Sequence, residues 1–415
     1  MNILFLTTNN LATNPRLYKE LNLALEQGYS CTLVQFKLGN WSDEKTKTLL
    51  EGKEVNVVQL DATSSHRFNW IKWGVLEKVA KMIYPFFKNQ LWVNALASSR
   101  RSFQILNANI NPFPDLICAH NLGALYPAWS LSKEFDIPFI FDVEDYHPGE
   151  FIRFDAFKEK GRREFLMKAL LPKANALTTA SPLIERQTLR LIDGHANNRV
   201  VLNGFPKSEF SGQDFMDQDG VLKIVWFSQK ISFGRGLEQF FTAISQMDEK
   251  RRGLIEVSLI GDLDPQFKQE ILVPIKNQGG IKLNVIPAIS QQDLHFELSN
   301  FDLGLAIEPG KDLNNNLAIS NKIIAYAQAG LYILATDTPA QRVFIEENSS
   351  LGTGSAQSTS GLLEKLIFIC DNLNQIKQDK QKRKVLGEGL SWEVQCDKVL
   401  QLWDKVVANK GVVVN

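Results

Sequence analysis

The sequence lacks the cysteine patterns that bind metal ions or build disulfide frameworks. Its four cysteines, Cys31, Cys118, Cys370 and Cys396, are far apart, form no C-x-x-C pair and have no histidine at ligand spacing. Cysteines scattered in this way are typical of small buried side chains in a reducing compartment. The pattern excludes a disulfide-rich secreted fold and a cysteine-ligated zinc site.

Long apolar runs are also missing. No stretch reaches the roughly 18 apolar residues that a membrane-spanning helix requires. The N-terminal MNILFLTTNN has a short apolar run with no basic segment before it, which favours a first β-strand over a signal peptide. We therefore expect a cytoplasmic protein.

The chain has no excess of either charge. Lysine plus arginine and aspartate plus glutamate both number 46, so no overall positive field favours nucleic acid as a partner. The loop after the first strand lacks the G-x-G-x-x-G fingerprint, so a dinucleotide cofactor is not supported. We expect no cofactor and no bound metal, because the acidic and histidine residues show no recognised ligand spacing.

What is present indicates an α/β architecture. A chain of 415 residues is too long for one ordinary core, and 44% hydrophobic with 22% charged residues is typical of a soluble globular protein. Apolar strands alternate with amphipathic helices, which predicts two Rossmann-like domains. We place these domains at 1–206 and 221–391, joined by a polar, turn-rich linker at 207–220 and followed by a last helix at 392–415.

Polar side chains follow two strands of the first domain, predicted at 116–119 and 138–141. They are His120 after the first strand, and Glu144, Asp145 and His147 after the second. Ligands of parallel sheets bind at the carboxyl ends of the strands, so this edge is a candidate site. The alternatives are that His120 is a loop residue bonded to backbone, and that the other three bind hydroxyl groups, supply a base or cap the next helix.

The second domain is predicted to begin with a strand at 222–227, a loop that contains Lys230 and Arg235, and a helix at 237–247. Loop amides, a helix N-terminus and two cations together are typical of a diphosphate site. Basic residues are also common in loops without this role.

A second candidate for anion binding lies further along this domain. A strand at 302–307 is followed by a helix that starts at Asn321, ends at Gly330 and leads into a buried strand. Ser320, Asn321 and Lys322 stand at the start of this helix, where unpaired N–H groups suit a phosphate or a sugar hydroxyl.

Residues 66–101 combine aromatic and basic side chains and contain one acidic residue, Glu77. Such a segment can lie in a membrane interface, with its cations toward anionic head groups. The alternative is that its apolar face packs on the sheet while its lysines remain in solvent.

Several of these stretches resemble one family. The order of a strand, a loop, Asn-Lys, a short helix, Ala-Gly and a strand at 302–335 resembles the donor-sugar site of GT-B glycosyltransferases, in particular the large retaining family that builds bacterial surface polysaccharides. NPR at 14–16, ICAHNLGAL at 117–125, VVLNGFP at 200–206 and RGL at 235–237 resemble further segments of that family. The family's E-x7-E glutamates are absent, because Leu317 and Ala325 occupy their positions.

The resemblance implies two Rossmann-like domains that face a cleft, with the last helix crossing back to the first domain. It implies transfer of a hexosyl group, with retention, from a nucleoside-diphosphate sugar to a glycan or polyprenyl-linked acceptor, either in the cytoplasm or peripherally on the inner face of the membrane.

The resemblance also implies roles for single residues. His120, Arg235 and Lys322 would be catalytic. The nucleotide sugar would contact Ser228, Lys230, Arg235, Pro287, Ser320, Asn321 and Lys322, and the acceptor side would include Asn14, Arg16, Glu144, Asp145 and His147. A catalytically inactive partner subunit and a nucleotide-sugar epimerase remain as alternatives.

Overall fold

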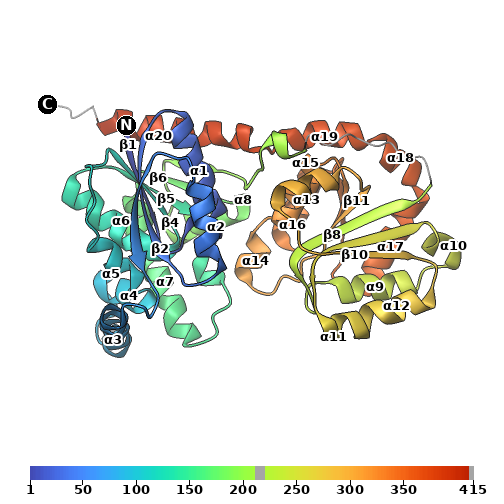
Figure 1. Ribbon diagram of the computed structural model, residues 1–415, viewed down its shortest axis with the longest axis horizontal. Helices are drawn as coiled ribbons and strands as arrows, with labels where there is room; N and C mark the ends of the chain where they lie inside the picture. Colours follow the sequence, from blue (N-terminus) through green and yellow to red (C-terminus); the bar gives the residue numbers. More distant parts are fainter. Residues whose placement is uncertain (211–219, 411–415) are drawn as a thin grey trace. The chain divides into compact units, whose positions relative to one another are not determined.

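The computed structural model describes residues 1–210 and 220–410, so most of the predicted linker lies outside the described residues. The chain divides into two compact units (Figure 1). The first unit consists of Met1–Val201 together with the chain from Cys396 onward, and the second is Leu202–Gln395. Helix α20 (Trp392–Lys410) is therefore shared between the two units.

The first unit, as far as it is described, is built on a seven-stranded parallel sheet in the order β3-β2-β1-β4-β5-β6-β7. The strands are β1 (Asn2–Thr7), β2 (Ser30–Lys37), β3 (Val55–Asp61), β4 (Leu116–His120), β5 (Phe139–Val143), β6 (Ala176–Thr179) and β7 (Asn198–Val200). Its own helices are α1 (Pro15–Glu26), α2 (Trp41–Leu50), α3 (Arg67–Ile83), α4 (Leu91–Ser98), α5 (Arg101–Leu106), α6 (Leu122–Phe135), α7 (Ala156–Leu170) and α8 (Pro182–Leu191). Trp403 of α20 is buried in this unit, with its ring centroid 6.3 Å from that of Phe5 in β1.

The second unit contains a six-stranded parallel sheet among its described residues, in the order β10-β9-β8-β11-β12-β13. The strands are β8 (Leu222–Ile231), β9 (Ile255–Leu263), β10 (Lys282–Ile286), β11 (Leu303–Ala306), β12 (Tyr332–Thr336) and β13 (Gly352–Ser355). The helices are α9 (Leu237–Ser245), α10 (Glu249–Arg252), α11 (Pro265–Phe267), α12 (Val273–Gln278), α13 (Gln291–Leu298), α14 (Leu313–Leu317), α15 (Asn321–Gln328), α16 (Pro339–Glu347), α17 (Thr359–Asp371), α18 (Leu373–Gln378) and α19 (Lys380–Glu388).

Both faces of the second sheet are covered, as expected for parallel strands. Along β8, Ile224 and Trp226 pack in a core cluster with α9 and α17, whereas Val225 between them packs in the opposite cluster with α15 and α16. This arrangement confirms the predicted α/β fold with two Rossmann-like units.

In each sheet the strand order reverses at one position. In the first unit this switch point lies between β1 and β4, and in the second it lies between β8 and β11. Because the helices on either side of a switch point leave in opposite directions, the crevice at the carboxyl ends of those strands is where open α/β sheets bind ligands. The fold therefore defines one candidate site in each unit.

Helix α3 differs from the other helices of its unit. Of its residues, Ala80 alone is buried. The interpretation in which the apolar face of residues 66–101 packs inward therefore fails for α3, whereas the following helix α4 buries Val93, Ala95, Leu96 and Ala97. In the described part of the chain, no helix is long and apolar enough to span a bilayer.

Candidate functional site

A pocket of about 370 Å³ lies at the switch point of the first unit. Thr8 and Asn9 line it after β1, and Asn121, Leu122 and Gly123 line it after β4. Helices α4 and α7 contribute further wall residues: Ala95, Ser98, Glu159, Arg163 and Leu166. The pocket thus has the position that the topology predicts for a ligand.

Two predicted site residues, Asp145 and His147, line this pocket. His147 is 8% exposed, and its Nδ1 lies 2.8 Å from Oε1 of Glu150. Burial opposes protonation, but the Glu150 carboxylate outweighs it and raises the pKa of His147. Arg163 donates to Glu150 and to the backbone carbonyl of His147, which holds the ring in place.

Two polar atoms of the pocket lack protein partners. Within the described residues, Nε2 of His147 and Oγ of Ser98 are buried and form no hydrogen bond. A buried polar group without a partner costs about 1–3 kcal/mol. Both residues line the pocket, but these two atoms are themselves covered by protein.

The backbone at the pocket floor is constrained. Asn121 has a positive φ of 68°, an uncommon conformation for a residue other than glycine, and the Thr7 hydroxyl donates to its side chain over 2.6 Å. A Cβ on Gly123 would lie 2.7 Å from Cγ2 of Thr8. Any larger residue at position 123 would intrude on the pocket wall.

At the same edge of the sheet, four charged side chains form a buried cluster, which we call the ion cluster: Arg16, Glu20, His120 and Asp142. Arg16 donates to both carboxylate oxygens of Asp142, over 2.8 and 2.7 Å. His120 lies between the two acids, with Nε2 3.3 Å from Glu20 and Nδ1 3.3 Å from Asp142. Each of the four residues is no more than 5% exposed.

The acids of this cluster keep His120 protonated. Burial alone would lower its pKa, but Glu20 and Asp142 outweigh burial and raise the pKa of His120 to about 10. The Asp142 carboxyl is buried too, and Arg16 nevertheless holds its pKa well below the usual range. The positive charges of Arg16 and His120 offset the negative charges of Glu20 and Asp142, so no charge of the cluster is buried without a partner.

The ion cluster makes stability depend on pH. The folded-state pKa of His120, about 10, lies above the roughly 6.5 of an unfolded histidine. Its stabilising contribution is complete below about pH 6.5 and is lost as the pH rises toward about 10. We expect the melting temperature to fall over this range more steeply in the wild type than in His120→Gln. His66→Gln, which alters an exposed histidine, is the control, and its melting temperature should follow that of the wild type. Melting temperatures of wild type and His120→Gln that fall in parallel with pH would contradict a charged His120.

These contacts change the interpretation of three predicted residues. His120 is the last residue of β4 and is 1% exposed, so it contacts the acids of the cluster and not a surface ligand. Arg16 is engaged by Asp142 and by the carbonyl of Val201. Asn14 caps helix α1 by accepting from the backbone N–H of Leu17. All three are engaged by other protein groups, and none of them lines the pocket.

Glu144 follows β5 at the same edge of the sheet. Burial is the largest influence on its carboxyl group and raises its pKa to about 7. A carboxylate with a pKa near neutrality is suited to accept a proton.

Glu20, His120 and Asp142 also form the kind of group that could hold a metal ion, because their ligand atoms lie within 4.8 Å of one another. Asp142, however, already accepts from Arg16 and from the Thr178 hydroxyl. A divalent cation would have to displace the His120 proton beside a guanidinium. These residues do not fit a metal, and we assign none.

In the second unit, cations gather around one carboxylate at the switch point. Nζ of Lys322 lies 2.7 Å from Oε1 of Glu308, and the Ser320 hydroxyl donates to the same oxygen over 3.2 Å. Burial would raise the pKa of Glu308, but Lys322 outweighs it and, together with Arg235, lowers that pKa. The Lys322 ammonium also lies 5.6 Å from the centroid of the Trp226 ring.

Arg235 lies near Glu308 because the loop that carries it passes close to the backbone at the end of β11. It precedes Gly236, which starts α9 with a φ of +83°, and a Cβ there would lie 2.4 Å from the Ile307 carbonyl oxygen. Only glycine lets the loop after β8 lie so near the end of β11. Arg235 itself makes no ion pair with another described residue, so its guanidinium can take an anion.

Other predicted residues of this unit lie differently. Strand β8 continues past the expected end at 227 to Ile231, with an irregularity between Phe227 and Lys230. Ser228 and Lys230 therefore belong to this strand and not to a loop, and Lys230 is 3.6 Å from Asp264 with its side chain 61% exposed. Pro287 is exposed just after β10. Asn321 accepts a hydrogen bond from Asn203 over 3.0 Å.

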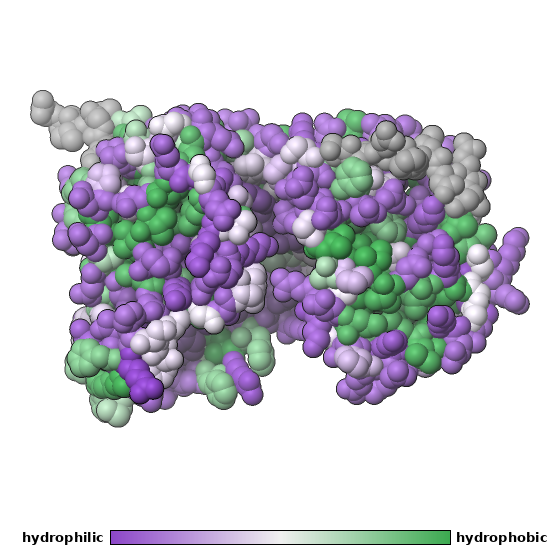
Figure 2. Space-filling view, viewed as in Figure 1, coloured by the Kyte–Doolittle hydropathy of each residue, from purple (hydrophilic) through white to green (hydrophobic). Residues whose placement is uncertain are grey.

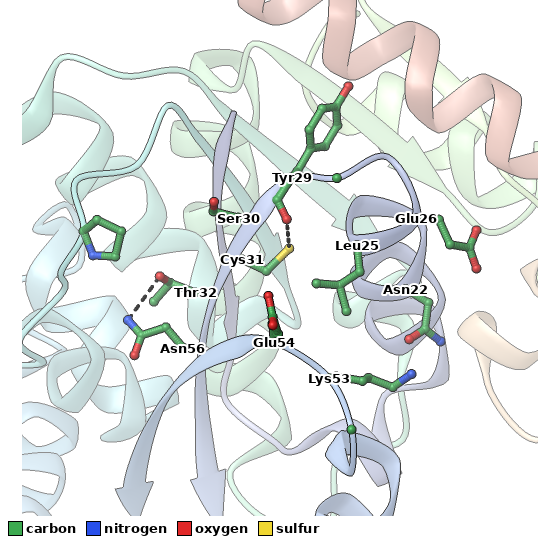
Figure 3. A pocket seen from close by; sticks show the side chains of 13 residues that line it. Asn22, Leu25, Glu26, Tyr29, Ser30, Cys31, Thr32, Lys53, Glu54 and Asn56 are labelled. Carbon is green, nitrogen blue, oxygen red and sulfur yellow. Dashed lines mark hydrogen bonds between the residues drawn. The ribbon is translucent and has the colours of Figure 1, made fainter.

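A larger hollow, of about 720 Å³, lies elsewhere on the first unit (Figure 3). It is lined by the first residues of β2, including Cys31 and Thr32, and by Glu54 and Asn56 near the start of β3. Figure 3 shows Asn56 bonded to Thr32 and the Cys31 thiol directed at the Tyr29 carbonyl. Because the hollow is at the amino ends of the strands, opposite the ligand-binding edge, we do not assign it to the site.

Sequence reasoning assigned no role in these sites to Glu20, Glu308, Ser98 or Arg163. Glu20 had a signal, because it lies one turn after Arg16 on the buried side of α1. Glu308 had one too, as an acid directly after a buried strand. Ser98 and Arg163 come from helices whose packing around the pocket no local pattern marks.

Comparisons with known proteins establish the fold. No protein-family model and no curated protein matches the sequence. A glycosyltransferase from Rickettsia africae is similar in structure, with a TM-score of 0.65 at 14% identity over 98% of this chain and 99% of that one. Sucrose-phosphate synthase from Thermosynechococcus elongatus has a TM-score of 0.66 at 13% identity, over 99% and 100% of the two chains. HepE of Anabaena, in complex with UDP, has a TM-score of 0.64 at 14% identity, over 98% and 100%. The chain has the GT-B fold.

Proposed function

We propose that this protein is a glycosyltransferase that moves a hexosyl group from a nucleoside-diphosphate sugar to an acceptor. The observation that carries the proposal is the group of Arg235, Ser320 and Lys322 around Glu308 at the switch point of the second unit. Two cations beside the N-terminus of α15 form a site for a diphosphate. The UDP in the HepE structure supports this class of ligand, since that protein has the same fold.

The chemistry required of such a site is charge stabilisation. As the glycosidic bond of the donor breaks, negative charge develops on the leaving diphosphate, and fixed cations lower the energy of that state. Lys322 and Arg235 would supply this stabilisation. The acceptor proton would pass to the leaving phosphate.

The finer assignments rest on family resemblance. We propose retention of the anomeric configuration, a role in bacterial surface polysaccharide synthesis, and a glycan or polyprenyl-linked acceptor whose hydroxyl groups meet the pocket of Asp145 and His147. The free cysteines fit a reducing compartment, so we place the protein in the cytoplasm.

Thermal shift against UDP, GDP, ADP and CMP, each with and without a sugar, tests the proposal. A ligand that binds only the folded state raises the melting temperature, by an amount set by its concentration relative to Kd. We expect a selective rise with one nucleoside diphosphate. No rise with any nucleotide would favour the inactive partner subunit, and conversion of the donor without an acceptor would favour an epimerase.

A further inference from the structure

An exposed apolar and basic surface lies on the first unit, formed by two segments far apart in the sequence. The first is α3 with the chain up to the start of α4, residues 67–92, and the second is the segment that leads into α7, residues 151–158. We call the two together the two-segment surface. Figure 2 shows apolar side chains gathered over α3 and near α7.

The outer face of α3 is a continuous apolar stripe. Its members follow helical spacing, and each is at least 40% exposed: Phe68, Ile71, Val75, Val79 and Met82. In the following turn, Phe86 is 84% exposed. A stripe of this length on a soluble domain marks an interaction surface.

The second segment adds three phenylalanines. Phe151, Phe154 and Phe157 are 77%, 76% and 92% exposed. Helix α4 packs against both α3 and α7, and Arg162 of α7 lies over the Tyr84 ring at the end of α3, 5.0 Å from its centroid. The two segments are therefore neighbours on one unit.

The charges of this surface are mainly positive. The two segments carry seven lysines and arginines against two acids, Glu77 and Asp155. Both acids are already paired, Glu77 with Lys81 and Asp155 with Lys158 and Arg162. Exposed aromatic and aliphatic side chains among an excess of cations complement a bilayer with anionic head groups.

The pocket lies between α7 and α4, the helix that packs against α3. Its wall includes Ala95 and Ser98 of α4, which follows the first segment, and Glu159 and Arg163 of α7, which follows the second. From this placement we infer that the two-segment surface docks on an anionic lipid bilayer and brings the pocket to the head group of a lipid-linked acceptor. The second half of this inference rests on the proposed transferase function.

Vesicle sedimentation tests the docking. The wild type should bind phosphatidylglycerol-containing vesicles, should bind pure phosphatidylcholine vesicles more weakly, and should be released by salt. Ile71→Glu/Val75→Glu and Phe154→Glu/Phe157→Glu should each reduce partitioning about ten-fold or more. All four side chains are more than half exposed, so the fold and the melting temperature should not change.

A matched control uses exposed apolar residues of the other unit. Phe368→Glu/Val385→Glu, at 50% and 59% exposure, should bind vesicles like the wild type. Equal binding by all variants, or no binding by the wild type, would overturn the inference. A dimer in light scattering that both test variants abolish would assign the surface to a second copy and overturn it as well.

The same samples separate this inference from the proposed function. The nucleotide-induced thermal shift should be identical in wild type and surface variants, because the donor site lies in the second unit. A nucleotide shift without vesicle binding overturns the docking alone. Vesicle binding without a nucleotide shift overturns the transferase alone.

Discussion

Lys322→Ala should weaken binding of the nucleoside diphosphate about ten- to hundred-fold. A hydrogen bond to a charged group contributes about 1.5–3 kcal/mol, which corresponds to that range of affinity. Loss of the ammonium also leaves Glu308 without its partner at 2.7 Å, so an uncompensated carboxylate would face the phosphates. Isothermal titration with the nucleotide selected by thermal shift measures the change.

Lys282→Ala is the matched control, because Lys282 belongs to the same unit and pairs with Glu256 at 3.1 Å. Its affinity should equal that of the wild type, and equal losses in Lys282→Ala and Lys322→Ala would refute the assigned site. Glu308→Gln provides the second comparison. If Glu308 serves to neutralise Lys322, this variant should bind the nucleoside diphosphate at least as tightly as the wild type.

The pairing of Lys322 with Glu308 also bears on the absent E-x7-E glutamates. Leu317 and Ala325, at the family's glutamate positions, are buried, so neither position presents a polar group to a ligand. Glu308 is a carboxylate at the same switch point. A loss of affinity for the nucleotide sugar but not for the nucleoside diphosphate in Glu308→Gln would assign the sugar hydroxyl contact to it.

Sequence patterns predict best those elements whose ends are marked by a capping residue. Helix α15 begins at Asn321, as predicted, because the side chain of Ser320 caps it. Strand β3 was not predicted. It lies at the edge of its sheet and buries none of its residues fully, so its apolar pattern is weak.

The candidate sites were predictable only in part. Strand ends mark the correct edge of each sheet, and Lys322 and Arg235 do lie together at one switch point. Whether a polar residue faces solvent or a buried partner depends on contacts distant in sequence. Arg16 and Asp142 are 126 residues apart, and no local pattern shows that each neutralises the other. The pocket likewise depends on how α4 and α7 pack.

Asp142→Ala should destabilise the first unit by about 3–5 kcal/mol, since removing one member of a buried ion pair leaves its partners uncompensated. Arg16 would lose two hydrogen bonds, and His120 would lose one of the two carboxylates that hold its charge. Hydrogen exchange of the β4 and β5 amides, read peptide by peptide, localises the effect to this unit.

Glu44→Gln removes an exposed ion pair with Lys47 in the same unit and should leave that exchange unchanged. A variant that replaces Arg16, Glu20, His120 and Asp142 together by apolar residues should recover part of the loss, because it leaves no charge of the cluster buried and unpaired. If Asp142→Ala exchanged like Glu44→Gln, the cluster would not be ionised. His120 would then be neutral at pH 7, and the fall in melting temperature toward pH 10 would have to come from other groups.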